Sequence, residues 1–176
     1  DAPIFGELIN RFLRGDFGAV SAVNPYLVAL LYAGDRYDAA PMINQWIHDG
    51  NLVILDRYVY SNIAFQCAKV EDVAQRKMLK DWILHLEYTY YKIPRPDLNL
   101  FLDVPFSFTS QNLLSVRKGN DRDYLNGKRD IHEDDLHFQQ KVREMYLWQV
   151  SENDDFKLIN CSNSSGNIKP PEEIFD

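Results

Sequence analysis

The sequence predicts an α/β domain in which helices flank a parallel sheet. Three short apolar runs have the length and the bounding turn residues of strands, and they cover residues 52–56, 98–104 and 156–160. Long helical patterns separate them, and strands joined by helical crossovers form parallel sheets. With 176 residues, of which 45% are hydrophobic, the chain is long enough for one domain with a substantial core.

The first half of the chain is predicted to contain helices followed by the first strand. The expected helices cover residues 3–13, 26–36 and 41–48. Asn24-Pro25 supplies an N-cap and an early proline for the second helix, and Gly34 alone would only weaken that helix. The run Leu52–Leu55 lies between a polar turn and Asp56, so we expect a strand that is buried on both faces.

The second half alternates helices with the two remaining strands. The expected helices cover residues 63–69, 73–91, 105–116 and 136–150. Residues 93–97 must be extended, because each proline pushes the preceding residue out of the helical conformation. The polar segment 117–133 contains glycine and charges of both signs, which predicts a mobile loop.

The composition argues against several classes of protein. A net charge of −7 does not suit general binding to nucleic acid or to a membrane surface, which needs a basic face. No apolar stretch approaches the ~18 residues that span a bilayer. Cys67 and Cys161 are far apart, match no metal spacing and follow no secretory signal, which fits a reducing, cytoplasmic setting.

Both ends of the sequence look interrupted. The first residue is Asp1, and the helix that begins near Pro170 has only about one turn before Asp176. A parallel sheet of three strands would also have open edges. We therefore expect the sequence to be an internal part of a longer protein, in which a further strand and helix of about 30 residues come before Asp1.

The first candidate site lies where the first predicted strand ends, at Asp56-Arg57-Tyr58. Ligands of parallel sheets bind in the crevice at the carboxyl ends of the strands. A neighbouring carboxylate and guanidinium suit a Mg²⁺-phosphate ligand, with Asp56 facing the metal and Arg57 holding phosphate oxygens. An ordinary surface ion pair after a strand fits the tripeptide equally well.

A second candidate pair precedes it. Tyr32 and Arg36 are four residues apart and therefore share one helix face. A ring and a guanidinium in this arrangement can stack on a nucleobase and hydrogen-bond its edge. The alternative is a core tyrosine with an exposed arginine.

Polar residues and a ring follow at a predicted helix start, namely Ser61, Asn62, Phe65 and Gln66. This combination suits a small anionic or base-bearing ligand. Capping of the helix by Ser61 or Asn62 would explain the polar residues as well.

Five cations lie in the predicted loop among acidic residues, and they are Arg117, Lys118, Arg122, Lys128 and Arg129. Cations in such a loop can close over phosphates and exclude water. A solvated charged loop is the simpler alternative.

Taken together, these segments resemble the thymidylate kinase family, within the P-loop nucleoside-monophosphate kinases. The matching motifs keep the family's order: an aromatic residue four before Arg36 in segment 30–36, the Asp-Arg-Tyr segment 53–66, the Pro-x-Pro-Asp turn 94–98 and a lid within 117–133. The similarity covers nearly the whole chain, and Asp-Arg-Tyr-x-x-Ser in this order is its specific part.

The resemblance implies a single kinase domain over residues 1–176, with a three-layer, P-loop NTPase-like parallel sheet, that transfers phosphate from ATP-Mg²⁺ to dTMP. Tyr32 would stack on thymine, Arg36 would hydrogen-bond its edge and Arg57 would hold the dTMP phosphate, while Asp56 would act near the magnesium. The other implied dTMP-site residues are Leu13, Asn62, Phe65, Gln66 and Tyr124. The implied lid cations at the ATP phosphates are Arg117, Lys118, Arg122 and Arg129. A homodimer is implied as well.

The sequence departs from the family pattern in one respect. The family's Gly-rich phosphate loop, which ends in Gly-Lys-Ser/Thr, is absent from the sequence. The segment that follows this loop in the family, and that brings another phosphate-binding arginine, is absent too. The implied fold therefore lacks its first strand and its phosphate loop. Without that loop the β- and γ-phosphates have no cradle. We therefore predict that the 176-residue chain is inactive and that its parent chain is a kinase.

Two alternatives stay open. Another kinase of the superfamily, such as a deoxynucleoside kinase or a different monophosphate kinase, would also carry Asp-Arg after a strand, and titration of dTMP against thymidine separates it. A non-catalytic paralogue would bind a nucleotide or a partner without a phosphate loop. The coding sequence upstream of Asp1 distinguishes this case, because a start codon favours the paralogue and Gly-Lys-Thr favours the kinase.

Overall fold

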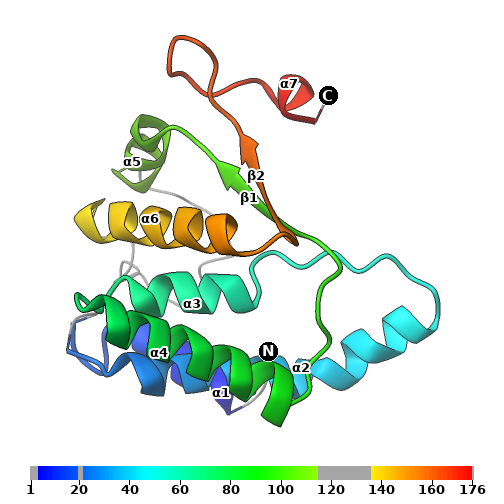
Figure 1. The fold of residues 1–176 in the computed structure, drawn as a ribbon. Helices are drawn as coiled ribbons and strands as arrows, with labels where there is room; N and C mark the ends of the chain where they lie inside the picture. The colour runs from blue at the N-terminus through cyan, green and yellow to red at the C-terminus, as the bar shows by residue number, and fades with distance from the viewer. Residues whose placement is uncertain (1–3, 20–21, 115–135, 176) are drawn as a thin grey trace.

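The computed structural model describes residues 4–19, 22–114 and 136–175. The elements follow in the order α1 Phe5–Leu13, α2 Pro25–His48, α3 Val59–Cys67, α4 Val73–Leu84, the π-helix η1 His85–Tyr90, β1 Asn99–Asp103, α5 Phe106–Leu114, α6 Leu136–Glu152, β2 Phe156–Asn160 and α7 Pro171–Phe175 (Figure 1). The predicted mixture of helices with a parallel sheet is confirmed.

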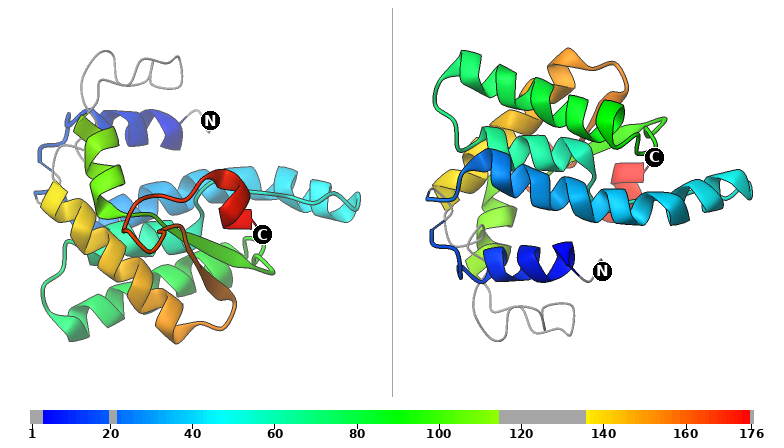
Figure 2. Two further views of the ribbon diagram at one scale, coloured as in Figure 1. Left: turned by 90° about the horizontal axis from the view of Figure 1, so that it is seen from above. Right: turned by 90° about the horizontal axis from the view of Figure 1, so that it is seen from below.

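Helix α2 is one long helix where the sequence predicted two. Asn24 caps it by accepting a hydrogen bond from the backbone N–H of Tyr26 at 2.9 Å, and Pro25 occupies the first helical position. Pro41 lies inside the helix without ending it. A proline removes one backbone hydrogen bond. Here the freed carbonyl belongs to Tyr37, whose side chain is about half exposed. The C-terminal part of α2 extends away from the other helices (Figure 2).

Helix α3 lies at the centre of the core, in contact with α2, α4 and α6. The buried apolar side chains that meet there include Val59, Ile63, Ala64 and Cys67 of α3, Leu79 and Ile83 of α4, and Val142 and Met145 of α6. Burial of this apolar surface is the main source of stability for a domain of this size. The spacing in the helix predicted at 136–150 turns Val142, Met145 and Val150 toward the core; Val142 and Met145 are buried there, and the partly buried Val150 packs against it.

The predicted helix 73–91 is divided into α4 and the π-helix η1. The apolar spacing of Leu79, Ile83 and Leu86 predicts one buried face for this helix. In the structure Leu86 is only half-buried, and Glu87 is fully buried instead. Glu87 is four residues after Ile83, so the two share a face and the carboxylate enters the core.

Strands β1 and β2 pair in parallel close to the predicted positions. One face of this sheet packs on α3 and α6, because Tyr60 stacks on Phe156 with ring centroids 4.6 Å apart and Phe101 stacks on Tyr146 at 4.7 Å. The leucines of β1 that point to the opposite face are about half exposed. The three-layer arrangement therefore stays a prediction.

The prediction of a strand at residues 52–56 is wrong. This segment connects α2 to α3 outside the sheet (Figure 1), and Leu52 and Ile54 are 89% and 84% exposed. A strand must exchange backbone hydrogen bonds with a neighbouring strand. Within the described ranges, β1 and β2 pair only with each other, so the apolar run has no ladder partner.

Two further predictions can be compared with the described residues. Within the described ranges, no helix combines the length and the apolar character needed to cross a bilayer. Both cysteines are buried free thiols, and burial raises the pKa of Cys67 to about 12, which keeps this thiol protonated and unreactive.

Candidate active site

Asp56 and Arg57 lie in the turn before α3, and both residues are exposed. Arg57 has a left-handed backbone with φ of 66°, a conformation that costs a residue with a side chain on the order of 1 kcal/mol or more. Its guanidinium lies over Phe65, with Cζ 5.3 Å from the ring centroid. Among the described contacts Asp56 and Arg57 do not pair with each other, so the surface ion pair considered from the sequence is absent.

Arg36 is held by Glu87, the buried carboxylate of η1. Nε of Arg36 donates to Oε2 of Glu87 at 2.5 Å, and Nη2 donates to Oε1 at 2.6 Å, which is the bidentate geometry of a strong ion pair. The guanidinium also lies near the ring of Tyr58, with Cζ 5.9 Å from the centroid. The Arg36 side chain is only 13% exposed, so the alternative of an exposed arginine is wrong.

Asn62 belongs to the same network. Its Nδ2 donates to the carbonyl oxygen of Ala29 in α2 and to Oε1 of Glu87, both at 3.1 Å. Its Oδ1 is buried without a hydrogen-bond partner among the described residues. Helix α3 begins at Val59, so Asn62 and Ser61 lie inside the helix and do not cap it. The network therefore brings α2, α3 and η1 together around one unsatisfied acceptor.

Gln66 lies one helical turn after Asn62 and is completely buried. Its Oε1 accepts a hydrogen bond from Nζ of Lys69 at 2.9 Å, and its Nε2 has no partner among the described residues. Burial lowers the pKa of Lys69 to about 8, and Nζ lies 5.0 Å from the ring centroid of Phe12. The contact with Phe12 places the end of α1, where Leu13 is half-buried, beside the end of α3.

Tyr58 and Tyr146, which have no role in the sequence-based assignment, also border the site. The hydroxyl of Tyr58 donates to the carbonyl of Pro94 at 3.0 Å, and burial raises the pKa of Tyr58 to about 12. Burial raises the pKa of Tyr146 in α6, which lies beside the side chain of Ser61. These contacts fix the turn around Arg57 to the Pro94 segment and to α6.

The structure thus brings most of the predicted site residues into one region of α2, α3 and the turn between them. This group contains Tyr32, Arg36, Asp56, Arg57, Asn62, Phe65 and Gln66, with Leu13 at the end of α1. The predicted lid residues Arg117, Lys118, Arg122, Tyr124 and Arg129 lie outside the described residues. Glu87, Lys69, Tyr58 and Tyr146 are additional members.

Asp56 is the residue that the sequence assigned to magnesium. In the described ranges, no three or more His, Cys, Asp or Glu side chains gather as a metal site. Mg²⁺ in phosphate-transferring sites is commonly held by one or two carboxylates while substrate phosphates and water complete its octahedron. An exposed Asp56 beside Arg57 fits that kind of site, in which most ligands do not come from the protein.

Comparison with known proteins extends this picture. The family model described as thymidylate kinase matches residues 3–170. The thymidylate kinase of Dictyostelium discoideum is 26% identical over 172 residues, which cover 97% of this chain and 65% of the relative. A probable thymidylate kinase of Pyrobaculum aerophilum is 29% identical over 171 residues, covering 96% of this chain and 72% of the relative. A solved thymidylate kinase structure from Candida albicans shares the fold, with a TM-score of 0.60 at 21% identity over 90% of this chain and 67% of that one.

The chain spans about two thirds of the length of these curated relatives. The matched range contains every described element of the site, from the end of α1 through the turn at Arg57 to α6. Because the family model covers nearly the whole chain, the chain belongs to the thymidylate kinase family.

Proposed function

We propose that this protein takes part in dTTP biosynthesis by phosphorylating dTMP to dTDP with ATP and Mg²⁺. The observation that carries the proposal is the pair formed by Arg36 and Asn62 around Glu87. Arg36 has N–H groups to donate, and Asn62 has a buried Oδ1 that can accept. The edge of thymine offers a carbonyl acceptor beside an imide N–H donor, which complements this pair.

The phosphate end of dTMP is assigned to the turn before α3. Arg57 supplies a guanidinium that can hold phosphate oxygens, and Asp56 can act near the magnesium. Phosphoryl transfer depends mainly on positioning and on neutralisation of charge, so a site of charged groups without a covalent nucleophile suits the reaction.

The remaining assignments extend the same proposal. Tyr32 stacks on thymine, and Phe65, Gln66 and Leu13 line the dTMP site. The residues assigned to the lid lie outside the described ranges, and they are Tyr124 over the nucleotide and Arg117, Lys118, Arg122 and Arg129 at the ATP phosphates.

Binding measurements with Arg57→Met test the phosphate assignment. We expect the native protein to bind dTMP at least about tenfold more tightly than thymidine, because one charge-assisted hydrogen bond contributes on the order of 1.5–3 kcal/mol. The variant should lose most of this advantage and bind thymidine unchanged. Calorimetric titration with both ligands measures the ratio. Equal affinity of the native protein for dTMP and thymidine, or preference for thymidine, would favour the deoxynucleoside kinase alternative.

The prediction that the 176-residue chain is inactive is separate from dTMP binding. An assay that couples ADP formation to dTMP addition, run on this chain, measures turnover separately from binding. Turnover that depends on ATP and dTMP in the 176-residue chain would contradict the prediction.

We also propose a cytoplasmic homodimer. Support comes from α2, which exposes several large apolar side chains, namely Leu27, Leu30, Met42, Trp46 and Ile47. Sedimentation equilibrium measures the mass directly. A monomer at micromolar concentration would contradict the dimer without affecting the dTMP assignment.

A further inference from the structure

We infer that Glu87 is a positioning residue that orients Arg36 and Asn62 and thereby determines which nucleobases the site accepts. The inference rests on the proposed function and deepens it. Glu87 is completely buried, and it accepts hydrogen bonds from both of the groups assigned to the base edge. No other described carboxylate contacts either group.

The carboxylate fixes the direction of the guanidinium. Nε and Nη2 of Arg36 each donate to Glu87, so Nη1 and the second N–H of Nη2 are left to face a ligand. The nearby ring of Tyr58 limits movement of the guanidinium out of this plane. Glu87 therefore presents one defined edge of Arg36 as a hydrogen-bond donor.

The same carboxylate fixes the amide of Asn62. Nδ2 faces Oε1 of Glu87 and the carbonyl of Ala29, and both of these atoms only accept hydrogen bonds. The amide cannot be turned over without placing its oxygen against two acceptors. Oδ1 is thus held as an acceptor, and it is the atom that stays without a partner among the described residues.

The result is a donor and an acceptor that are ordered before any ligand binds. A 4-keto pyrimidine offers an acceptor and then a donor, which match Arg36 and Asn62. A 4-amino pyrimidine offers a donor and then an acceptor, which oppose them. Groups held in place beforehand lose little entropy on binding and reject a reversed pattern strongly, because each mismatch leaves a buried polar group unpaired. The π-helical turn that carries Glu87 is a rare element, and such turns often occur at functional sites.

Glu87→Gln tests this role. The glutamine places an N–H group against one N–H of Arg36, so the guanidinium loses its fixed direction. We expect the Kd for dTMP to rise about tenfold or more and the ratio of dCMP to dTMP dissociation constants to fall by a similar factor. The ratio for dUMP against dTMP should stay unchanged, because both carry the keto pattern. An unchanged dCMP to dTMP ratio in a folded variant would overturn the inference.

Glu152→Gln is the matched control, because it removes the carboxylate of another ion pair between helices, one that involves Lys80 and not Arg36. It should lower stability without moving the dCMP to dTMP ratio. If it moves the ratio as much as Glu87→Gln does, the effect is a general loss of stability and the inference fails.

A measurement on the native protein covers the case in which Glu87→Gln does not fold. In ¹H–¹⁵N spectra we expect the Nε–H signal of Arg36 to be shifted downfield and slow to exchange before dTMP is added, and to change little afterwards. A signal that appears only with dTMP would mean that the ligand orders Arg36, which overturns the inference. If the native protein does not bind dTMP at all, the proposed function and the role of Glu87 both fail. If the native protein binds dTMP and Glu87→Gln leaves the dCMP to dTMP ratio unchanged, only the role of Glu87 fails.

Discussion

The ring of Phe5 in α1 lies directly against Gly34 in α2, and a Cβ added at Gly34 would stand 2.3 Å from Cε1 of Phe5. A glycine inside a helix costs about 1 kcal/mol relative to alanine, so its presence needs a structural reason. Here the reason is the close approach of α1. The contact anchors the helix that brings Phe12 and Leu13 to the site.

We expect Gly34→Ala to destabilise the protein by about 1–3 kcal/mol, because the methyl group displaces the Phe5 ring and overpacks the α1–α2 interface. Equilibrium urea unfolding measures the change. The double variant Phe5→Ala/Gly34→Ala should lose less than the sum of the two single variants, because it removes the clash. Stabilisation by Gly34→Ala, as in a free helix, would show that the contact is unimportant.

The lowered pKa of Lys69 predicts that the free energy of unfolding rises with pH. Its pKa is lowered to about 8 in the folded protein by burial, against 10.5 as the ordinary value. The unfolded chain therefore binds more protons between these values, and the free energy of unfolding increases as pH rises through this window. Relative to Lys69→Met, the native protein should gain about 1–2 kcal/mol between pH 8 and pH 9.5. Chemical denaturation at several pH values tests this, and parallel pH curves would contradict it.

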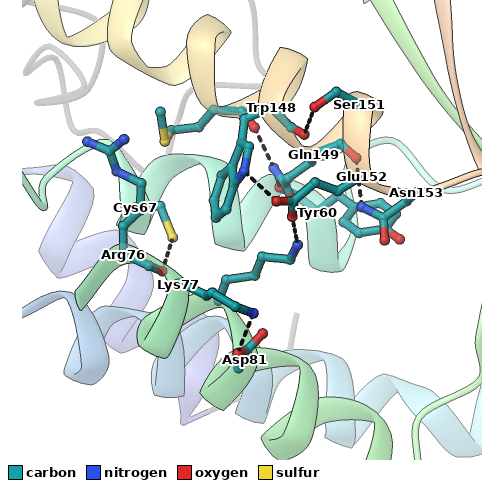
Figure 3. Close-up of polar contacts among 12 residues, drawn as sticks. Tyr60, Cys67, Arg76, Lys77, Asp81, Trp148, Gln149, Ser151, Glu152 and Asn153 are labelled. Carbon is teal, nitrogen blue, oxygen red and sulfur yellow. Dashed lines mark hydrogen bonds and ion pairs between the residues drawn. The ribbon is translucent and has the colours of Figure 1, made fainter. Parts of the chain in front are cut away.

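Glu152 predicts a dependence of the same sign at acid pH, where stability again rises with pH. Its pKa is lowered chiefly by the hydrogen bond from Lys80, and Nε1 of Trp148 donates to its Oε1 at 2.8 Å (Figure 3). The carboxylate therefore stabilises the fold above its unfolded pKa, and this contribution is lost as pH falls through the folded pKa. The Glu152 side chain is 44% exposed, so solvent screens the pair, and we expect Glu152→Gln to cost about 1 kcal/mol at pH 7 and progressively less toward pH 3.

Asp81→Asn is the comparison for that experiment. Asp81 pairs with Lys77 at 3.1 Å on the exposed side of α4 (Figure 3). Both of these side chains are more than half exposed, so the variant should change stability by no more than about 0.5 kcal/mol. If Asp81→Asn loses more stability than Glu152→Gln, the burial of Lys80 does not strengthen its ion pair with Glu152.

Two substitutions at Arg57 distinguish the effect of its left-handed backbone from the effect of its charge. Arg57→Gly and Arg57→Ala both remove the guanidinium, but only glycine adopts a φ of 66° without a steric penalty. We expect the glycine variant to be more stable than the alanine variant by about 1 kcal/mol, and both to lose affinity for dTMP equally. Thermal unfolding tests the expected difference in stability, and dTMP titration tests the expected equal loss of affinity. An alanine variant as stable as the glycine variant would show that the turn relaxes freely.

Part of the site could be predicted from the chain because its members are near one another in sequence. Asp56, Arg57, Asn62, Phe65 and Gln66 occupy one turn and one helix, so spacing alone places them together. Glu87 carried no local signal. Its partners are 51 and 25 residues away, and only the packing of η1 against α2 and α3 brings the three together.

The error at Leu52–Leu55 has a related cause. The apolar run has strand composition, but a strand also depends on a neighbour for its backbone hydrogen bonds, and composition does not contain that information. The predicted break between the helices at 26–36 and 41–48 is also wrong, because α2 continues through Pro41 to His48.

The sequence by itself determined where most helices lie and which two segments form the parallel strands, since periodicity, caps and turn residues act over a few neighbours. The tertiary structure alone decided which groups are buried and how they face one another. It placed Glu87 between Arg36 and Asn62 and Tyr146 beside Ser61. Hydrogen bonding in a buried site depends on atoms from distant segments, and only the packed fold brings those atoms within reach.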